Sequence, residues 1–205
     1  MSNWKEKRWE KEPTLYKVIR PLARWLLKVV YRAKVVGLEN IPSEGSVVLA
    51  GNHKNYLDPV FVMGVVPRVV WFLAKVELTR GIAGLFFPYF GIIPVDRSIH
   101  DKQSLQIAMD YLDEGRCVGI FPEGTFNESE QPVLPFKVGA VKMALGTGSP
   151  VVPFTITGAY RPFRRGLTLT FYPPLPIEGM EVEQARMTLQ QFISNRLEES
   201  NGYQL

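Results

Sequence analysis

The sequence predicts a single α/β domain with a mostly parallel sheet flanked by helices. Short apolar runs alternate with helical patterns after residue 34, an arrangement typical of such folds. The length of 205 residues is ordinary for one domain with a substantial core. No internal repeat or low-complexity segment divides the chain. We therefore expect one α/β domain over residues 35–205, preceded by a segment of different character over residues 1–34.

Local patterns place the elements of this domain. Apolar runs rich in β-branched residues predict strands near residues 34–37, 46–50, 69–73, 92–95, 117–121, 151–156 and 167–172. Helical spacing predicts helices near residues 59–65, 76–88, 102–114, 137–147 and 181–198. Ligands of open α/β sheets bind at the carboxyl ends of the strands. The loops that follow the predicted strands are therefore the candidates for a functional site.

Residues 1–34 are strongly basic. They hold ten Lys or Arg against three Glu, a balance of +7, whereas the remainder of the chain carries −3. Apolar residues recur at helical spacing and predict one face of a helix: Leu15, Val18, Ile19, Leu22, Leu26, Val29, Val30 and Ala33. Basic residues predict the other face: Lys17, Arg20, Arg24, Lys28 and Arg32. Pro21 interrupts the pattern and should kink or split the helix.

Two interpretations of this amphipathic helix are open. Its basic face, with Tyr16, Trp25 and Tyr31 as interfacial rings, favours reversible docking to a phospholipid membrane surface. The alternative is packing on the protein's own core. A nucleic-acid partner is disfavoured because the apolar face would stay exposed on DNA or RNA. We expect a peripheral or monotopic protein on the cytoplasmic face of the cell membrane.

Histidine and cysteine are scarce in this chain. The single cysteine, Cys117, excludes an intrachain disulfide and lies in an apolar run that predicts a core position. His53 and His100 are the two histidines, and their dispersion makes a zinc site improbable. We expect no metal and no bound cofactor. His100 has the character of a surface residue, which leaves His53 as the candidate base.

His53 and Asp58 lie five residues apart in the run NHKNYLDP, residues 52–59. A histidine whose second ring nitrogen is held by a carboxylate is fixed in one tautomer and is a better proton acceptor, which is how hydroxyl groups are usually activated. The run contains no serine. The pair therefore indicates activation of a hydroxyl group that belongs to the substrate.

Asp58 has a second explanation. It precedes Pro59, and an Asp before a Pro is a good N-cap, so Asp58 alone also fits the start of the helix over residues 60–65. Residues five apart on an ideal helix point about 140° apart, so the pair cannot meet on a helical face. The residue before a proline is pushed out of the α region, so we expect a tight loop in which His53 and Asp58 meet.

Three further segments follow apparent strands: GIIPVDR at residues 91–97, FPEGT at 121–125 and VVP at 151–153. Together with the His53 run, and in this order, they resemble the four blocks of the glycerolipid acyltransferases, most closely the bacterial lysophosphatidic acid acyltransferases. The resemblance spans roughly residues 35–158.

The resemblance implies transfer of an acyl group from a thioester of coenzyme A or acyl carrier protein to the sn-2 hydroxyl of lysophosphatidic acid, giving phosphatidic acid. His53 would act as general base and Asp58 would orient it, without a covalent acyl-enzyme. The resemblance implies substrate binding by a further set: Lys75, Arg97, Glu123, Gly124, Thr125 and Pro153. By charge alone, Lys75 could equally be a solvated lysine at the start of a helix. Arg97 could equally form an ion pair with nearby acidic residues.

The chain departs from the family pattern after Thr125. Many relatives carry an arginine there that is implicated in phosphate binding, whereas this chain continues with Phe126 and Asn127. Lys137, or the arginines of residues 161–165, would compensate, or would form a solvated face. The alternatives are therefore an acyltransferase with a different lysolipid acceptor, or a non-catalytic membrane-binding module on the same fold. The presence of His53, Asp58, Arg97 and Glu123 together argues against the non-catalytic module.

Overall fold

The computed structural model describes residues 14–76, 91–96 and 102–202. In these residues one sheet has the strand order β1-β7-β6-β2-β5-β3-β4. The bounds are Lys34–Val36 for β1, Val47–Gly51 for β2, Val70–Lys75 for β3, Ile92–Val95 for β4, Cys117–Ile120 for β5, Val151–Thr157 for β6 and Thr168–Phe171 for β7. β6 and β7 pair antiparallel and every other neighbouring pair is parallel. The predicted mostly parallel sheet is confirmed.

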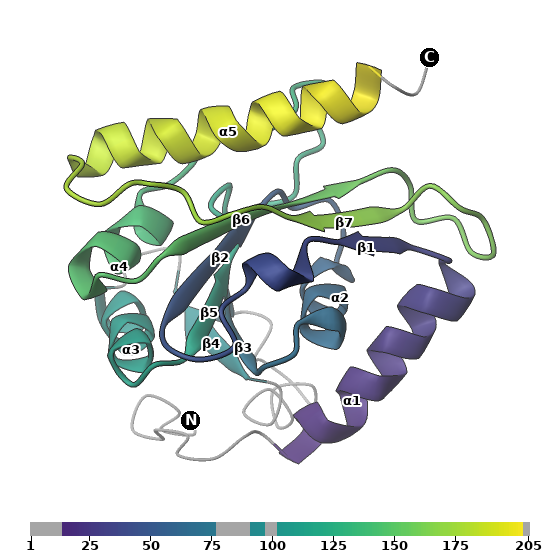
Figure 1. Ribbon diagram of the computed structural model, residues 1–205, viewed down its shortest axis with the longest axis horizontal. Coiled ribbons are helices and arrows are strands. Elements are labelled where there is room, and N and C mark those ends of the chain that lie inside the picture. Colours follow the sequence, from purple (N-terminus) through teal and green to yellow (C-terminus); the bar gives the residue numbers. More distant parts are fainter. Residues whose placement is uncertain (1–13, 77–90, 97–101, 203–205) are drawn as a thin grey trace.

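Helices cover both faces of this sheet (Figure 1). Their bounds are Thr14–Trp25 for α1, Asp58–Val65 for α2, Lys102–Asp113 for α3, Gly139–Thr147 for α4 and Val182–Gly202 for α5, with a π-helical turn η2 at Leu26–Val30 and a 3-10 turn η3 at Leu38–Asn40. α1 and α2 pack together on one face, and α3, α4 and α5 on the other. The helix predicted over residues 76–88 lies almost wholly outside the described residues.

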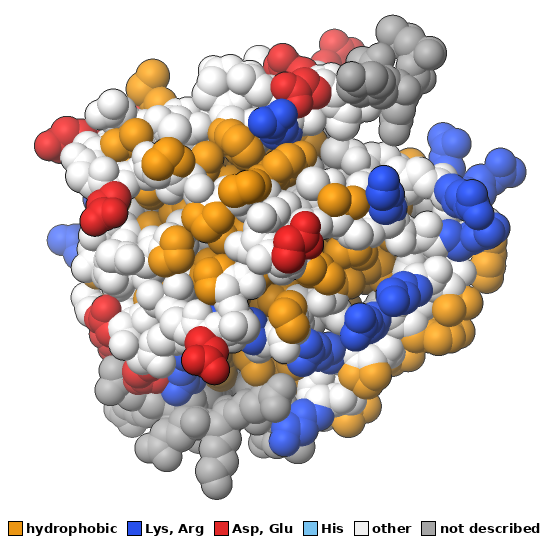
Figure 2. Space-filling model, viewed as in Figure 1, with side chains coloured by type: hydrophobic (Ala, Val, Ile, Leu, Met, Phe, Trp, Pro, Cys, Tyr) orange, Lys and Arg blue, Asp and Glu red, His pale blue; other side chains and the backbone are white. Residues whose placement is uncertain are grey.

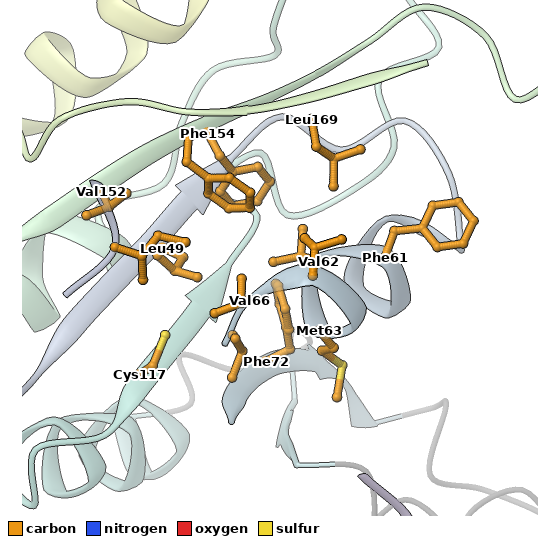
Figure 3. Packing of buried hydrophobic residues seen from close by; sticks show 14 of the residues in the cluster. Leu49, Phe61, Val62, Met63, Val66, Phe72, Cys117, Val152, Phe154 and Leu169 are labelled. Carbon is orange, nitrogen blue, oxygen red and sulfur yellow. The ribbon is translucent and has the colours of Figure 1, made fainter. Parts of the chain in front are cut away.

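The central strand β2 explains how the sheet builds two cores. All five of its residues are buried. Val47 and Leu49 join the core under α1 and α2, while Val48 and Ala50 join the core under α3, α4 and α5. The first of these cores is aromatic and aliphatic, and includes Cys117 as predicted (Figure 3). A strand buried on both faces fixes the position of the loop that follows it.

The N-terminal helix packs on α2, but through a different face from the one predicted. Tyr16, Ala23 and Leu27 are its buried residues. The Tyr16 hydroxyl accepts the Val70 N–H at 3.0 Å, and Arg20 donates to the Val66 carbonyl at 2.7 Å. A Cβ at Gly64 would lie 2.9 Å from the Ala23 Cβ, so this glycine permits the close helix crossing. The helix therefore belongs to the fold, as the second interpretation holds.

The predicted apolar face is divided, since Leu26 and Ala33 pack against the core while other residues of that side lie on the surface. Val18, Leu22, Trp25 and Val29 are exposed by 64, 60, 53 and 49 %. The helix thus has a buried face on α2 and a separate apolar stripe on the surface. Of the kink or split expected at Pro21, the split is wrong, since α1 continues through this residue, and the kink stays a prediction.

Within the described parts of the chain, no helix combines the length and the apolar character needed to cross a membrane.

Candidate active site

The loop that follows β2 begins with an asparagine that extends the sheet. The Asn52 side-chain amide donates to the Ile156 carbonyl at 3.0 Å, and its oxygen accepts the Ile156 N–H at 2.8 Å. Asn52 is buried, so these two bonds replace those that its amide would otherwise make with water. The side chain therefore ties the end of β2 to β6 and fixes the starting point of the next residue, His53.

His53 and Asp58 meet across the loop, as predicted. The His53 Nδ1 lies 2.9 Å from the Asp58 Oδ2. The same oxygen accepts the backbone N–H groups of Lys54 at 2.6 Å and Asn55 at 2.8 Å. Asp58 is fully buried and is the first residue of α2, with its carboxylate turned back toward the loop. The alternative that it only caps the helix is wrong, because the N–H groups it receives precede the helix.

This pattern of donors defines the ring of His53 chemically. An ionised carboxylate only accepts hydrogen bonds, so a bond from Nδ1 to Asp58 places a proton on Nδ1. The neutral ring then carries its free lone pair on Nε2. Asp58 also orients the ring and would stabilise the positive charge that forms on proton uptake. The pair is thus arranged to take a proton from a group that reaches Nε2.

Two phenylalanines enclose the His53 ring. Phe121 stacks on it at a centroid distance of 4.0 Å and an interplanar angle of 10°, and Phe126 lies on it at 4.3 Å and 50°. The His53 side chain is only 15 % exposed. Phe126 follows Thr125, where the resemblance would have an arginine. In this chain the Phe126 ring packs against the imidazole, and the position supplies no cation for a phosphate.

Tyr160 is a contact of the pair that the sequence analysis missed. Its hydroxyl donates a short hydrogen bond to the Asp58 Oδ1. Its ring stacks on Phe61 and packs edge-on against Tyr31, each at 5.7 Å between centroids. Burial and the Asp58 carboxylate raise the pKa of Tyr160, so the hydroxyl stays protonated and acts as a donor. Tyr160 follows β6, and His53 follows β2, so both lie at the carboxyl ends of the strands. The position of Tyr160 after a predicted strand is the feature of the sequence that could have indicated its place near His53.

Replacing Tyr160 by phenylalanine should lower kcat about three- to thirtyfold and leave KM within twofold. The range corresponds to loss of part of a hydrogen bond to a charged group, worth about 1.5–3 kcal/mol. The reason is that Asp58 Oδ1 loses its hydroxyl donor while the buried ring is retained. Steady-state kinetics measures the effect. Tyr31→Phe is the matched control, since it removes a hydroxyl from the ring that packs on Tyr160. Equal losses in both variants would refute the role of the Asp58 contact.

Glu123 joins the His53 loop to a second loop. Its Oε1 accepts the His53 backbone N–H at 2.9 Å and its Oε2 accepts the Leu134 N–H at 2.8 Å. The residue is 4 % exposed. Burial raises the pKa of Glu123, against the lowering effect of these two backbone bonds. The structure thus gives Glu123 a role in holding the loop of the base, beside any contact with an acceptor.

The variant Glu123→Gln should destabilise the fold by about 1–3 kcal/mol, because one of the two N–H groups loses its acceptor. Since the native pKa of Glu123 is raised, the folded protein binds its proton more tightly than the unfolded chain does. The stability that this tighter proton binding gives the folded wild type is complete below the ordinary pKa of 4.5. It is lost as the pH rises through the pKa that Glu123 has in the folded protein. Urea unfolding from acid to neutral pH should therefore show the difference between wild type and variant narrowing as the pH rises. A difference in unfolding free energy between wild type and Glu123→Gln that increases with pH would contradict the raised pKa of Glu123.

The turn at Gly124 brings Lys137 to the site. Gly124 has φ +74° and its N–H donates to the Phe121 carbonyl at 3.0 Å. A Cβ at this position would lie 3.1 Å from the Lys137 Cε and Nζ. The Lys137 N–H donates to the Pro122 carbonyl at 2.8 Å. Lys137 therefore lies beside the FPEGT segment of residues 121–125. Thr125, which follows Gly124 in the sequence, is exposed.

The other predicted binding residues have different surroundings. Lys75 is exposed and is the last residue of β3, and most of the segment that follows it lies outside the described residues, so both the binding role and the solvated helix-start position stay predictions. Pro153 is buried within β6, opposite Ala50 of β2, and its carbonyl accepts the Tyr172 N–H at 2.9 Å. The structure therefore gives Pro153 a position within the sheet, and its part in substrate binding stays a prediction. Arg97 follows β4 by two residues and lies outside the described residues, as do His100 and residues 1–13.

A groove of about 470 Å³ opens beside the base. His53, Lys54 and Glu123 line it, together with residues of three other segments: Asn127, residues 129–132, Ile156 and Thr157 of β6, and Leu197 and Glu198 of α5. The Lys54 Nζ donates to the Gly158 carbonyl at 2.6 Å, and burial lowers the pKa of this lysine. The groove gives extended substrates a route to His53.

A histidine held by a buried carboxylate, at the carboxyl edge of a mostly parallel sheet, is the arrangement of an α/β enzyme that activates a hydroxyl group. The chain belongs to the acyltransferase family, which it matches over residues 32–157. It is 35 % identical over 140 residues to a 1-acyl-sn-glycerol-3-phosphate acyltransferase of Borreliella burgdorferi and 31 % identical over 146 residues to one of Bacillus subtilis. These matches cover 66 and 70 % of this chain, and 54 and 72 % of the two relatives, so the chain spans about half the length of the first.

A solved structure has the same fold. The crystal structure of the 1-acyl-sn-glycerophosphate (LPA) acyltransferase PlsC from Thermotoga maritima superposes with a TM-score of 0.73 at 26 % identity. The match covers 90 % of this chain and 79 % of that one. The family and fold expected from the four blocks are therefore confirmed.

Proposed function

We propose that this chain transfers a fatty acyl group from an acyl thioester to the sn-2 hydroxyl of 1-acyl-sn-glycerol 3-phosphate, giving phosphatidic acid. The observation that carries the proposal is the 2.9 Å contact between His53 Nδ1 and the buried Asp58, which leaves Nε2 as a proton acceptor. The names of the relatives described above support the acceptor and the reaction.

In this mechanism His53 acts on the substrate hydroxyl directly. Its Nε2 takes the hydroxyl proton as the oxygen bonds to the thioester carbonyl carbon, and Asp58 stays ionised and stabilises the imidazolium. The tetrahedral intermediate then breaks its carbon–sulfur bond. The departing thiolate takes the proton from His53, so an ester and a free thiol leave and the base is regenerated.

Cys117 is unsuited to act as a nucleophile in this reaction. It is fully buried, and burial raises the pKa of its thiol to about 12. It pairs with Val47 at the start of β2, whereas His53 follows the other end of the same strand. A direct attack in a ternary complex therefore fits the site better than a covalent intermediate.

We assign the acceptor phosphate to cations at the carboxyl edge of the sheet. Lys137 beside Gly124 and Lys75 at the end of β3 are the described candidates, and Arg97 remains one by its place in the sequence. Lysine and arginine are the side chains that bind phosphate monoesters with charge-assisted hydrogen bonds. The donor is a thioester of coenzyme A or acyl carrier protein, with no bound cofactor required.

We further propose that the protein docks peripherally on the anionic cytoplasmic leaflet. The support is the exposed stripe of Val18, Leu22, Trp25 and Val29. Lys17, Arg24 and Lys28 are exposed on the same helix. Apolar residues with flanking lysines and arginines bind such interfaces without crossing them. A lysolipid substrate resides in the same layer.

The test is thioester consumption by the purified protein on lysophosphatidic acid vesicles, with acyl-coenzyme A and acyl carrier protein donors in separate reactions. Released thiol is measured with a disulfide reagent, to which the buried Cys117 should contribute no background. A parallel reaction contains a lysolipid without the phosphate monoester.

Each outcome assigns the acceptor. Thiol release only with lysophosphatidic acid supports the proposal. Release only with the other lysolipid would replace the acceptor, an alternative favoured by Phe126 standing where relatives carry a cation. No release with either acceptor and either donor would leave a non-catalytic membrane-binding module as the better explanation.

A further inference from the structure

The loop between β6 and β7 presents an aromatic side chain in an unusual setting. Phe163 is 70 % exposed and has φ +60°, the left-handed region. Non-glycine residues rarely adopt this conformation, and Asn and Asp are the usual exceptions. A phenylalanine that is both exposed and in this conformation contributes little to the stability of the isolated protein. Its presence indicates a role outside the fold.

The same loop is joined to the N-terminal helix. The Phe163 N–H donates to the Val30 carbonyl at 2.5 Å, at the end of the π-helical turn η2. Val29, the last residue of the exposed apolar stripe, immediately precedes that carbonyl. The backbone of Phe163 is therefore attached beside the last residue of the stripe. Figure 2 shows hydrophobic side chains along the edge of the molecule that α1 and this loop form in Figure 1, beside a row of Lys and Arg.

Three arginines flank Phe163 in the sequence of the loop. Arg161, Arg164 and Arg165 are exposed, and none of them makes an ion pair with any residue that the structure describes. Cations on both sides of an exposed ring match a surface in which phosphate groups overlie hydrocarbon. An aromatic ring at that depth, with arginines at the phosphates, is a favourable arrangement in lipid interfaces.

We propose that the loop Ala159–Gly166 is a second membrane-docking element, in which Phe163 enters the acyl region of an anionic bilayer and the three arginines bind lipid phosphates. The inference rests on the membrane docking proposed above and adds to it a surface that the helix alone does not supply. Two elements fix the orientation of a protein on a bilayer, whereas one helix permits rotation about its axis.

This orientation has a consequence for the active site. Tyr160, three residues before Phe163, contacts Asp58, and the Lys54 amine binds the Gly158 carbonyl at the base of the loop. The loop that enters the bilayer is thus attached directly to the residues that hold His53. Docking through Phe163 brings the base to the lipid surface, where the lysolipid hydroxyl is located.

The experiment is vesicle flotation of the full chain with phosphatidylcholine vesicles, with and without phosphatidylglycerol. Phe163→Asn should weaken binding to the anionic vesicles by roughly tenfold, the loss expected for one aromatic side chain. Asparagine tolerates the left-handed conformation, so the loop is retained. Phe163→Trp should preserve binding. Replacing Arg161, Arg164 and Arg165 by Gln should weaken it by about fivefold per arginine and reduce its dependence on salt.

Met187→Ser is the matched control. Met187 is 58 % exposed on α5, on the other face of the sheet, so its loss should leave binding unchanged. Leu22→Ser on the N-terminal helix reports on the docking proposed above. Turnover of a short-chain lysophosphatidic acid below its micellar concentration should be equal in wild type and Phe163→Asn, which separates docking from catalysis.

The two proposals fail in different ways. Weaker binding by Leu22→Ser but not by Phe163→Asn would overturn the role of the loop and leave helix docking intact. A wild type that binds neither kind of vesicle would overturn both docking proposals while acyl transfer to the short-chain acceptor could still be measured. Self-association that depends on Phe163, with unchanged vesicle binding, would assign the surface to a second copy and refute the inference.

Discussion

The variant His53→Ala should lose acyl transfer almost completely, with kcat/KM reduced by about 10²–10⁴, the range for a positioned general base. The structure gives His53 one oriented nitrogen, because Nδ1 is committed to Asp58 and the ring is confined between Phe121 and Phe126. In its absence water is the remaining proton acceptor. Thiol release at saturating donor measures the loss, and His100→Ala, which changes the other histidine of the chain, is the control.

Rescue by imidazole provides a second measurement on the same variant. Removing the ring leaves a space between two phenylalanine rings, with the Asp58 carboxylate at one end. Added imidazole should enter it and restore part of the activity in a saturable manner. Retention of more than about a tenth of wild-type activity without imidazole would contradict the role of His53, given the magnitude for general base catalysis.

The strands and the His53–Asp58 contact could be predicted because each depends on neighbours in the sequence. Apolar runs with turn residues around them located all seven strands of the described sheet to within two residues at either end. The contact of His53 with Asp58 was predicted correctly, although Asp58 is the first residue of α2 and is not kept out of the helix by Pro59 as expected. The two residues meet because His53 lies in the short loop that leads into the start of this helix.

The enclosure of the site depends on distant residues and was not predicted. Tyr160 is 102 residues from Asp58, and Phe121 and Phe126 reach His53 from the loop after β5. Only the strand order β6-β2-β5 brings these loops together. The sequence showed that Phe126 stands where many relatives carry an arginine. It did not show that the Phe126 ring packs on the imidazole of His53.

The N-terminal helix illustrates a different limit. Helical periodicity predicted one apolar face and one basic face, and it did not include the three side chains that are buried. Tyr16, Ala23 and Leu27 are buried because Gly64 of α2 permits a close crossing at Ala23. The more hydrophobic side chains Val18 and Leu22 are left on the surface. Steric fit to α2 selected the buried face, and a sequence pattern carries no direct record of that fit.

The variant Asp58→Asn should reduce kcat by about 10⁴ while the fold remains stable, as similar pairs do when the carboxylate is neutralised. The asparagine oxygen can occupy the place of Oδ2 and keep the backbone N–H bonds of Lys54 and Asn55. Its amide then occupies the place of Oδ1 and donates to Tyr160, whose hydroxyl can turn to accept. The loop is retained, but the charge that stabilises the imidazolium of His53 is lost.

Comparison with Asp58→Ala separates the two functions of this carboxylate. Alanine leaves the Lys54 and Asn55 N–H groups without their acceptor and should destabilise the protein by about 1–3 kcal/mol for each group that water does not reach. Urea unfolding should therefore rank the variants by stability as wild type, Asn, then Ala, whereas kcat should be similarly low in both. A nearly wild-type kcat in Asp58→Asn would show that Asp58 supports the loop and that its charge does not contribute to the rate. Low kcat at full stability would assign the rate to the charge that Asp58 presents to His53.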